Sequence, residues 1–177
     1  PPRVPVEPMH TSVTTRHVTL ADIPAISRLH QTVFGPGRFV RSAYRVREGK
    51  GYLSRFCRLA QAGERIIAAL RLTPVCIGAD GGAVLLGPIA VDPAFAGKGF
   101  GRRLISEALD EMRAAGVSLV ILVGDEPYYG RFGFKPVAIG QITFPGPVNP
   151  ARILACELSK GALARYRGLI ATEGPAH

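Results

Sequence analysis

Cysteine is scarce in this chain of 177 residues. The three cysteines, Cys57, Cys76 and Cys156, are an odd number and lack the spacing of a metal site. Each lies in a largely apolar stretch, so we expect buried, reduced thiols rather than a catalytic cysteine. The pattern predicts neither a disulfide framework nor a bound metal ion.

Long apolar runs are also missing. The longest, such as residues 117–123, are far shorter than the ~20 residues that span a bilayer, so we expect no membrane partner. The first nine residues hold four prolines and no apolar segment typical of a secretory signal. We therefore predict a loose tail at residues 1–12, one domain at residues 13–177, and a cytoplasmic location.

The composition indicates a folded protein with an anionic partner. Apolar residues make up 47% of the chain, which excludes a wholly disordered protein. The net charge is +9, and 18 of the 22 basic residues are arginine. Such a balance suits a nucleic acid or a phosphate-bearing cofactor, and the charge alone does not choose between them.

The hydrophobic pattern predicts a mixed α/β fold. An apolar stripe at helical spacing follows a short strand at residues 17–19, and a second helix is expected over residues 38–48. Three antiparallel strands are predicted at residues 54–61, 65–77 and 83–91. A glycine-rich loop, an amphipathic helix and an apolar strand then complete a strand–loop–helix–strand crossover over residues 83–123. A short helix at residues 127–132 and a closing hairpin of residues 138–144 and 152–158 follow.

The glycine-rich loop is the clearest candidate binding site. It lies between a predicted strand and a predicted helix, where glycines allow close backbone approach and the free N–H groups of the helix start favour an anion. Lys98 and Arg102 add positive charge. We expect a phosphate or pyrophosphate to bind the loop residues Gly97, Lys98, Gly99, Phe100, Gly101 and Arg102.

Four interpretations of this loop compete. A P-loop requires Ser or Thr after Gly-Lys, and Gly99 follows Lys98 here. A dinucleotide fingerprint requires G-x-G-x-x-G within several βα units, and the sequence shows only one such unit. Coenzyme A and a glycine turn without a ligand remain.

Two segments together resemble the GNAT superfamily of acyl-CoA-dependent N-acyltransferases. Residues 86–104, LGPIAVDPAFAGKGFGRRL, resemble its strand, pyrophosphate loop and helix, and residues 128–134, YYGRFGF, resemble its Y-x-x-x-G-F element. Gly124-Asp125 and the second segment together resemble the sequences of a bacterial branch of largely uncharacterised members. There are two departures: Ala96 replaces the usual Gln or Arg at the head of the loop, and the strand at residues 84–91 carries no acid for a general base.

The resemblance implies roles for individual residues. The backbone of Ile89 and Val91 would pair with the pantetheine arm of acetyl-CoA, and an N–H near Ile89 or Ala90 would stabilise the oxyanion. Tyr129 would protonate the departing thiolate, since a phenol with a pKa of about 10 can donate to a thiolate whose conjugate acid has a pKa near ~8.5. Tyr128 is expected to be a packing residue.

The base and the acceptor are less defined. His30, Asp125 and Glu126 are candidate bases because they are expected near the site, although a cap or surface role is the commoner one for such groups. An arginine stripe in the second predicted helix would attract an acidic acceptor or form a solvated face; it consists of Arg38, Arg41 and Arg45.

These observations predict an N-acetyltransferase that moves an acetyl group from acetyl-CoA to a primary amine. The amine is not identified. The alternatives are a non-catalytic acyl-CoA-binding regulatory domain and an arginine-rich nucleic-acid-binding protein, although the chain has no recognisable nucleic-acid motif. The sequence does not fix the oligomeric state, and a homodimer is retained as one alternative.

Overall fold

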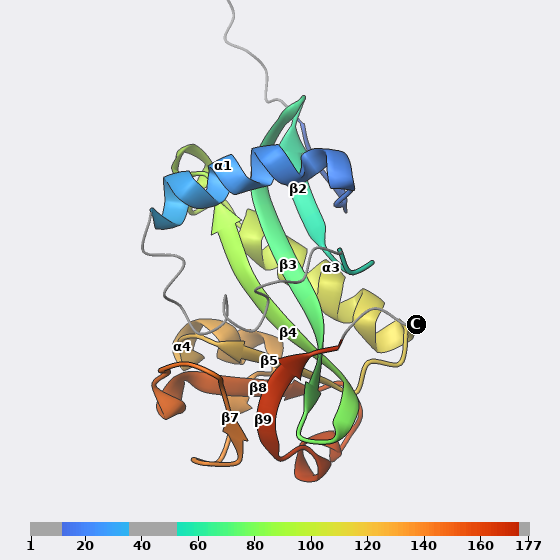
Figure 1. The fold of residues 1–177 in the computed structure, drawn as a ribbon. Helices are drawn as coiled ribbons and strands as arrows, with labels where there is room; N and C mark the ends of the chain where they lie inside the picture. Colours follow the sequence, from blue (N-terminus) through green and yellow to red (C-terminus); the bar gives the residue numbers. More distant parts are fainter. Residues whose placement is uncertain (1–11, 36–52, 174–177) are drawn as a thin grey trace, which may run out of the picture.

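The computed structural model describes residues 12–35 and 53–173, which form a mixed α/β structure built on a twisted sheet (Figure 1). The strand order is β1-β2-β3-β4-β5-β8-β6, and β9 pairs with both β3 and β7. The strands are β1 (Val13–His17), β2 (Arg58–Ala62), β3 (Arg65–Ile77), β4 (Asp80–Val91), β5 (Leu119–Val123), β6 (Lys135–Pro136), β7 (Ile142–Thr143), β8 (Ile153–Glu157) and β9 (Gly168–Thr172). The helices are α1 (Ile23–Phe34), α3 (Phe100–Ala114) and α4 (Glu126–Tyr129). The predicted α/β class is confirmed.

Some predictions fall on residues that the structure does not describe. The predicted tail lies outside the described residues except for Ser12. The helix predicted over residues 38–48 also lies outside them, together with its arginine stripe. Among residues 12–35 and 53–173, no helix has the length and apolarity needed to cross a membrane.

The antiparallel strands β1 to β4 form the first half of the sheet. β2 and β3 are joined by a tight turn at Gly63-Glu64, as the sequence predicted, and β1 pairs with the other edge of β2. The predicted bounds at two strands were wrong. β2 begins at Arg58 because residues 54–57 form a turn, in which the Ser54 hydroxyl accepts a hydrogen bond from the Phe56 amide at 3.2 Å. β1 ends at His17 because the Thr19 amide donates to the Asp22 carboxylate at 2.7 Å and so turns the chain.

A bulge divides β4 into two parts. Leu72 pairs with Leu86 and Leu70 pairs with Ile89, so two steps along β3 correspond to three steps along β4. The extra residue lies in the Gly87-Pro88 pair opposite Arg71. It reverses the alternation of side chains, because even-numbered residues face α3 before the bulge and odd-numbered residues face it afterwards.

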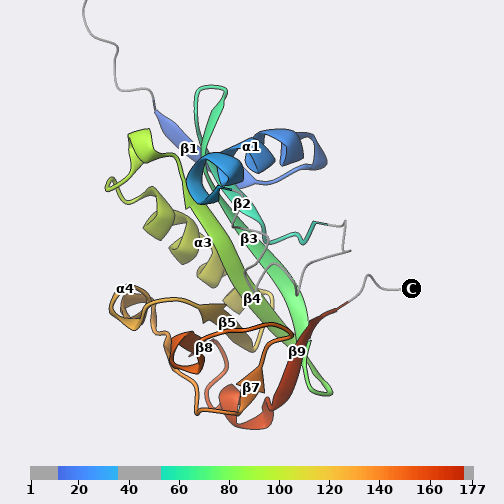
Figure 2. The same ribbon diagram turned by 60° about the vertical axis from the view of Figure 1, so that its left-hand side comes forward.

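The predicted crossover from β4 through α3 to β5 is confirmed, since β4 and β5 pair in parallel. The apolar stripe of α3 is buried against the sheet; it consists of Leu104, Ile105, Ala108, Leu109 and Met112. The two larger helices lie on opposite faces of the sheet (Figures 1 and 2). α3 covers one face, and α1 covers the other through contacts of Leu29 with Leu59, Ala69 and Ala90.

The predicted closing hairpin of residues 138–144 and 152–158 does not form. β8 lies between β5 and β6, whereas β7 pairs in parallel with β9 near the C-terminus. The sequence left residues 159–177 unassigned, and these residues supply the missing partner. β9 can dock there because Gly78 has no side chain: a Cβ on Gly78 would lie 2.3 Å from the Arg167 carbonyl oxygen. The loop of residues 145–150 therefore connects strands that are not neighbours.

The start of α1 is tied to β1 by an ion pair. The Asp22 carboxylate accepts hydrogen bonds of 2.8 Å from both terminal nitrogens of Arg16, and a bond from the Thr19 amide. The Arg16 guanidinium holds the pKa of the buried Asp22 carboxyl far below its ordinary value. Because the pKa is lower in the folded state, the stabilisation is present at neutral pH and is lost as the pH falls below about 3.9, the unfolded value.

We expect Asp22→Asn to lower the free energy of unfolding by about 1–3 kcal/mol, because it removes a charged acceptor from a nearly buried network. Urea denaturation at pH 7 measures the difference. Asp110→Asn is the matched control, since this carboxylate is 82% exposed and its ion pair, with Arg113, is 3.5 Å long. Equal stability losses in the two variants would contradict the assignment of Asp22 as the anchor of α1.

Candidate functional site

The two central strands separate after a short parallel pairing. β4 and β5 are paired only from Ala83 to Leu85 and from Leu119 to Ile121. Beyond the bulge, β4 continues toward the start of α3, whereas β5 turns away toward α4 (Figures 1 and 2). Among the described residues, no strand pairs with residues 86–91 on the edge that β5 has left.

The backbone direction along β4 shows which amides face this open edge. The Asp92 amide donates to the Ile67 carbonyl at 2.8 Å, so residue 92 faces β3. Amides alternate in direction along an antiparallel strand. Ala90 therefore also faces β3, whereas Ile89 and Val91 turn their N–H and C=O groups to the open edge. An extended ligand could pair with these two residues as an added strand, and Ala90 instead contributes its methyl group to the α1 face.

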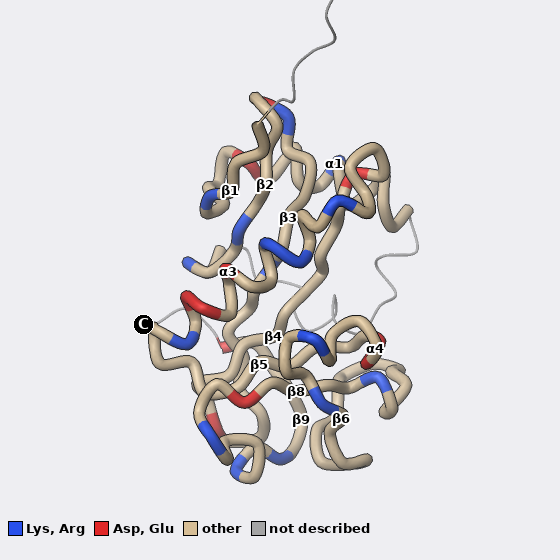
Figure 3. Tube along the Cα trace, turned by 180° about the vertical axis from the view of Figure 1, so that it is seen from behind, with Lys and Arg blue, Asp and Glu red and all other residues tan. Residues whose placement is uncertain are grey.

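The glycine loop lies at the end of the open edge. Gly97 and Gly99 have φ angles of 76° and 86°, which other residues rarely adopt. The first helical bond of α3 is from the Arg103 amide to the Gly99 carbonyl, so the amides of residues 100–102 precede it and are available to an anion. Lys98 and Arg102 are exposed and have no acidic partner among the described residues. Figure 3 shows this concentration of basic residues at the N-terminal end of α3.

Gly101 is the point where the loop, β4 and α4 meet. A Cβ placed on Gly101 would lie 3.4 Å from Ile89 Cδ1, 3.5 Å from Val91 Cγ2 and 3.7 Å from the Tyr128 hydroxyl. Because Gly101 has no side chain, the space between it and these three side chains stays open although it is narrow. The structure therefore brings together residues that the sequence placed in three separate elements.

Tyr129 lies against the end of β5. A Cβ on Gly124 would lie 2.5 Å from Tyr129 Cε2, so the tyrosine ring occupies the space that a larger residue would fill. The ring also contacts Tyr128 edge-on, with centroids 4.8 Å apart, and Phe134, with centroids 6.1 Å apart. The hydroxyl has no hydrogen-bond partner within residues 12–35 and 53–173. Burial raises the pKa of Tyr129 to about 12.

Tyr128 makes packing contacts of the kind expected for it. Its ring contacts Phe132 and lies beneath the Arg131 guanidinium, which is 4.9 Å from the ring centroid. Its hydroxyl nevertheless faces Gly101 across the junction. The sequence could not predict the direction of the Tyr128 hydroxyl, because Tyr128 and Tyr129 are neighbours on a helix of one turn and both lie close to the sheet.

The three candidate bases lie in different surroundings. Asp125 is 73% exposed and pairs with Arg152 at 3.2 Å. Glu126 is exposed in the first turn of α4. His30 lies half-buried on α1 with its ring against Phe34, 5.7 Å between centroids. His30 lines a pocket.

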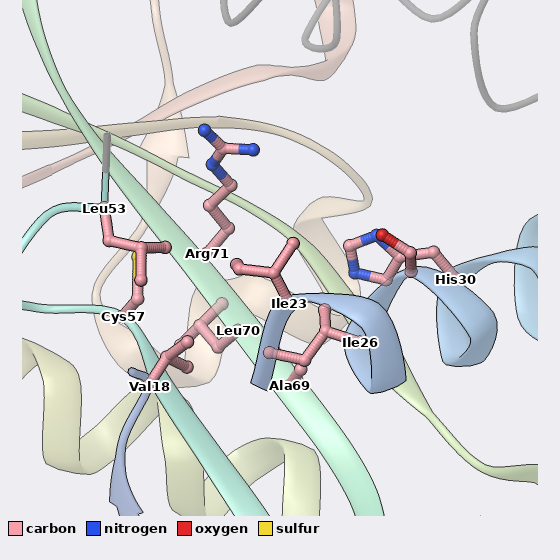
Figure 4. Close-up of a pocket in the computed structure, with 10 residues that line it drawn as sticks. Val18, Ile23, Ile26, His30, Leu53, Cys57, Ala69, Leu70 and Arg71 are labelled. Atoms are coloured by element: carbon pink, nitrogen blue, oxygen red, sulfur yellow. The ribbon is translucent and has the colours of Figure 1, made fainter. Parts of the chain in front are cut away.

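The pocket lies between α1 and β3, on the face of the sheet opposite α3. It has a volume of about 180 Å³ and is lined by Val18, Ile23, Ile26, Ser27, His30, Leu53, Cys57, Ala69, Leu70 and Arg71 (Figure 4). Sequence analysis identified His30 and Cys57 but not their proximity, and it did not identify Arg71. The only sequence signal for Arg71 is that it is the one charged residue in the mostly apolar run of residues 66–77.

The cysteines and acids do not form a metal site in the described part of the chain. Cys57 and Cys156 are buried, Cys76 is half-buried, and all three are free thiols, as expected. No group of three or more His, Cys, Asp or Glu side chains lies close enough together there to hold a metal ion.

Comparison with known proteins gives consistent matches. Residues 14–137 match the family model described as an acetyltransferase (GNAT) domain. The chain is 28% identical over 150 residues to the uncharacterised N-acetyltransferase YhbS of Escherichia coli K12, covering 84% of this chain and 89% of the relative. It is 35% identical over 82 residues to the uncharacterised N-acetyltransferase YjhQ of the same strain, covering 46% of this chain and 45% of the relative.

Two solved structures are similar over most of the chain. The crystal structure of E. coli YhbS in complex with CoA has a TM-score of 0.77 and 26% identity, covering 95% of this chain and 93% of that one. A GNAT family acetyltransferase from Brucella melitensis in complex with acetyl-CoA has a TM-score of 0.61 and 28% identity, covering 82% and 96%.

Proposed function

The chain belongs to the GNAT acetyltransferase family, and on that basis we propose that residues 13–177 act as one N-acetyltransferase domain. It would move an acetyl group from acetyl-CoA to a primary amine by direct attack on the thioester. The observation that carries the proposal is the open edge of β4, where the backbone groups of Ile89 and Val91 have no partner among the described residues and lie beside a cationic glycine loop.

The parts of acetyl-CoA would bind in order along β4. The pyrophosphate would bind the N-terminal amides of α3, with Lys98 and Arg102 nearby. The pantetheine amides would pair with Val91 and Ile89, since an extended chain with alternating donors and acceptors can replace β5 there. The thioester would then lie near the bulge, where the Ile89 amide could stabilise the oxyanion.

The reaction needs one proton to leave the amine and one to reach the sulfur. The amine nitrogen, entering as the free base, attacks the carbonyl carbon, and the C–N bond forms as the C–S bond breaks. Tyr129 donates its proton to the departing thiolate, and its own proton is replaced by the one that the amine releases. Burial raises the pKa of a thiol as it does that of a phenol, so the donor and the acceptor remain matched inside the site.

Calorimetry with acetyl-CoA and NAD tests the cofactor. We expect acetyl-CoA to bind and NAD to bind much more weakly, because the single crossover lacks the second βα units of a dinucleotide fold. Tight binding of NAD without binding of acetyl-CoA would disprove the proposal.

A screen of primary amines with free-thiol detection tests the reaction. We expect release of CoA that depends on the amine. Binding of acetyl-CoA without turnover on amino acids, polyamines, aminoglycosides and peptides would favour the alternative of a non-catalytic acyl-CoA-binding regulatory domain.

A further inference from the structure

Arg71 differs from the other half-buried arginines of the described residues. Arg16 is paired with Asp22 at 2.8 Å, and Arg58 is paired with Glu107 at 3.2 Å and Glu111 at 3.4 Å. No hydrogen bond or ion pair involves the Arg71 side chain within residues 12–35 and 53–173. A half-buried guanidinium without a partner among these residues is available to pair with an anionic ligand.

The surroundings of Arg71 are those of a binding pocket. Arg71 lines the pocket between α1 and β3, and Figure 4 shows its guanidinium at the edge of the group of lining side chains, with the aliphatic side chain of Ile23 between Arg71 and His30. Ile26, Leu53 and Ala69 complete an apolar wall. A ligand that fits this pocket would combine an apolar body with a negative group.

The pocket also lies beside the proposed reaction centre. Arg71 is opposite the Gly87-Pro88 bulge, because its neighbours Leu70 and Leu72 pair with Ile89 and Leu86. Adjacent strands are about 4.8 Å apart. A ligand held by Arg71 on the α1 face would therefore lie one strand away from the backbone at which the thioester is expected to end.

We propose that Arg71 binds the carboxylate of the acceptor, and that the acceptor is a small primary amine with a carboxylate and an apolar body. The inference rests on the proposed acetyl transfer for the identity of the reacting group. The planar guanidinium accepts a carboxylate in a bidentate geometry, which also fixes the direction of the amine. The small apolar wall accommodates the rest of the molecule.

Binding of a product-like pair tests the site without requiring turnover. In the presence of saturating CoA, calorimetry would compare N-acetyl-L-leucine with N-acetyl-L-leucinamide, which lacks only the carboxylate charge. We expect wild type to prefer the carboxylate about 10- to 100-fold, the range typical of a charged hydrogen-bonded pair. Arg71→Gln should abolish the preference, and N-acetyl-leucinamide should bind both proteins alike.

Two further variants control for charge and for folding. Arg28→Gln removes the same charge from an exposed position on α1 and should retain the preference. Arg71→Lys keeps the charge but cannot form the bidentate pair, so its preference should be intermediate. Thermal melts identify a variant that fails to fold, and the lysine variant then replaces the glutamine variant in the comparison.

Turnover with L-leucine, L-leucinamide and 3-methylbutylamine completes the test, and O-phosphoethanolamine distinguishes a phosphate from a carboxylate. We expect wild type to favour leucine in kcat/KM, with the preference lost in Arg71→Gln. Equal kcat/KM for leucine and the two neutral amines, or a preference for O-phosphoethanolamine, would overturn the inference about Arg71. Neither result would contradict the proposed acetyl transfer. Carboxylate binding through Arg71 without any transfer would refute the proposed function and leave the site assignment intact.

Discussion

Replacing Tyr129 by phenylalanine should lower the chemical rate by about 10²- to 10⁴-fold, the contribution typical of a positioned acid. The affinity for acetyl-CoA should be nearly unchanged, because the lost interaction develops only as the C–S bond breaks. Single-turnover measurement of thiol release, with calorimetry of acetyl-CoA binding, separates these effects.

The surroundings of Tyr129 support this expectation. The ring is held between Gly124, Tyr128 and Phe134, all of which a phenylalanine ring would contact equally well. The hydroxyl has no partner among the described residues, so its removal breaks no hydrogen bond that supports the fold. A loss of rate in this variant would therefore report the proton donor and not a disturbed packing.

The pH dependence provides a second measurement on the same residue. Because Tyr129 acts in its protonated form and its pKa is raised to about 12, the rate should not fall between about pH 9 and 10.5, where a tyrosine with the ordinary pKa of about 10 would ionise. The rate should instead rise with pH until the amine is deprotonated. A rate that falls with a midpoint at about pH 10 would show that the essential acid is another group.

Tyr128→Phe is the control for the missing hydroxyl. Because the Tyr128 hydroxyl faces Gly101 in the cofactor loop, we expect it to change the affinity for acetyl-CoA by less than about tenfold and to leave the chemical rate intact. If Tyr128→Phe lost the chemical rate and Tyr129→Phe kept it, the two tyrosines would have exchanged roles. Unfolding of Tyr129→Phe would favour the packing interpretation instead.

Gly101→Asp should weaken the binding of acetyl-CoA by about 100-fold or more. The new side chain would enter the junction between Ile89, Val91 and Tyr128, and its charge would repel the pyrophosphate at the start of α3. Juxtaposed like charges cost several kcal/mol, and each 1.4 kcal/mol is about tenfold in affinity. Calorimetry with acetyl-CoA measures the loss.

Two variants separate the charge from the steric effect. Ser106→Asp adds the same charge to an exposed position farther along α3 and should alter the affinity only slightly. Gly101→Ala adds a methyl group that meets its neighbours at 3.4 Å or more, so it should fold and show an intermediate loss. Wild-type affinity in Gly101→Asp would place the pyrophosphate elsewhere on the protein.

The crossover from β4 to β5 shows what local pattern can predict. The stripe of α3, the glycines that precede it and the apolar run of β5 each have a spacing that favours one structure, and all three were confirmed. The closing hairpin shows the opposite case. Residues 138–144 and 152–158 have strand-like composition, but the partner of β7 is β9, and strand pairing between distant segments leaves no local signal.

The sequence by itself therefore determined the family and the order of the central elements, because both depend on motifs formed by residues that are neighbours along the chain. The phosphate-binding loop and the choice of Tyr129 over Tyr128 as the acid remain predictions, and the choice of Tyr129 comes from the family resemblance. The resemblance already implied that Ile89 and Val91 pair with the cofactor, but only the tertiary structure decided that the Ala90 amide faces β3 and not the open edge, because that direction is set by pairing with β3. It also decided that Arg71 and His30 line one pocket, since two residues 41 positions apart come together only when α1 packs across β3. The sequence suggests no role for Arg71. The fold does, because it places Arg71 in a pocket where no acidic side chain of the described residues pairs with it.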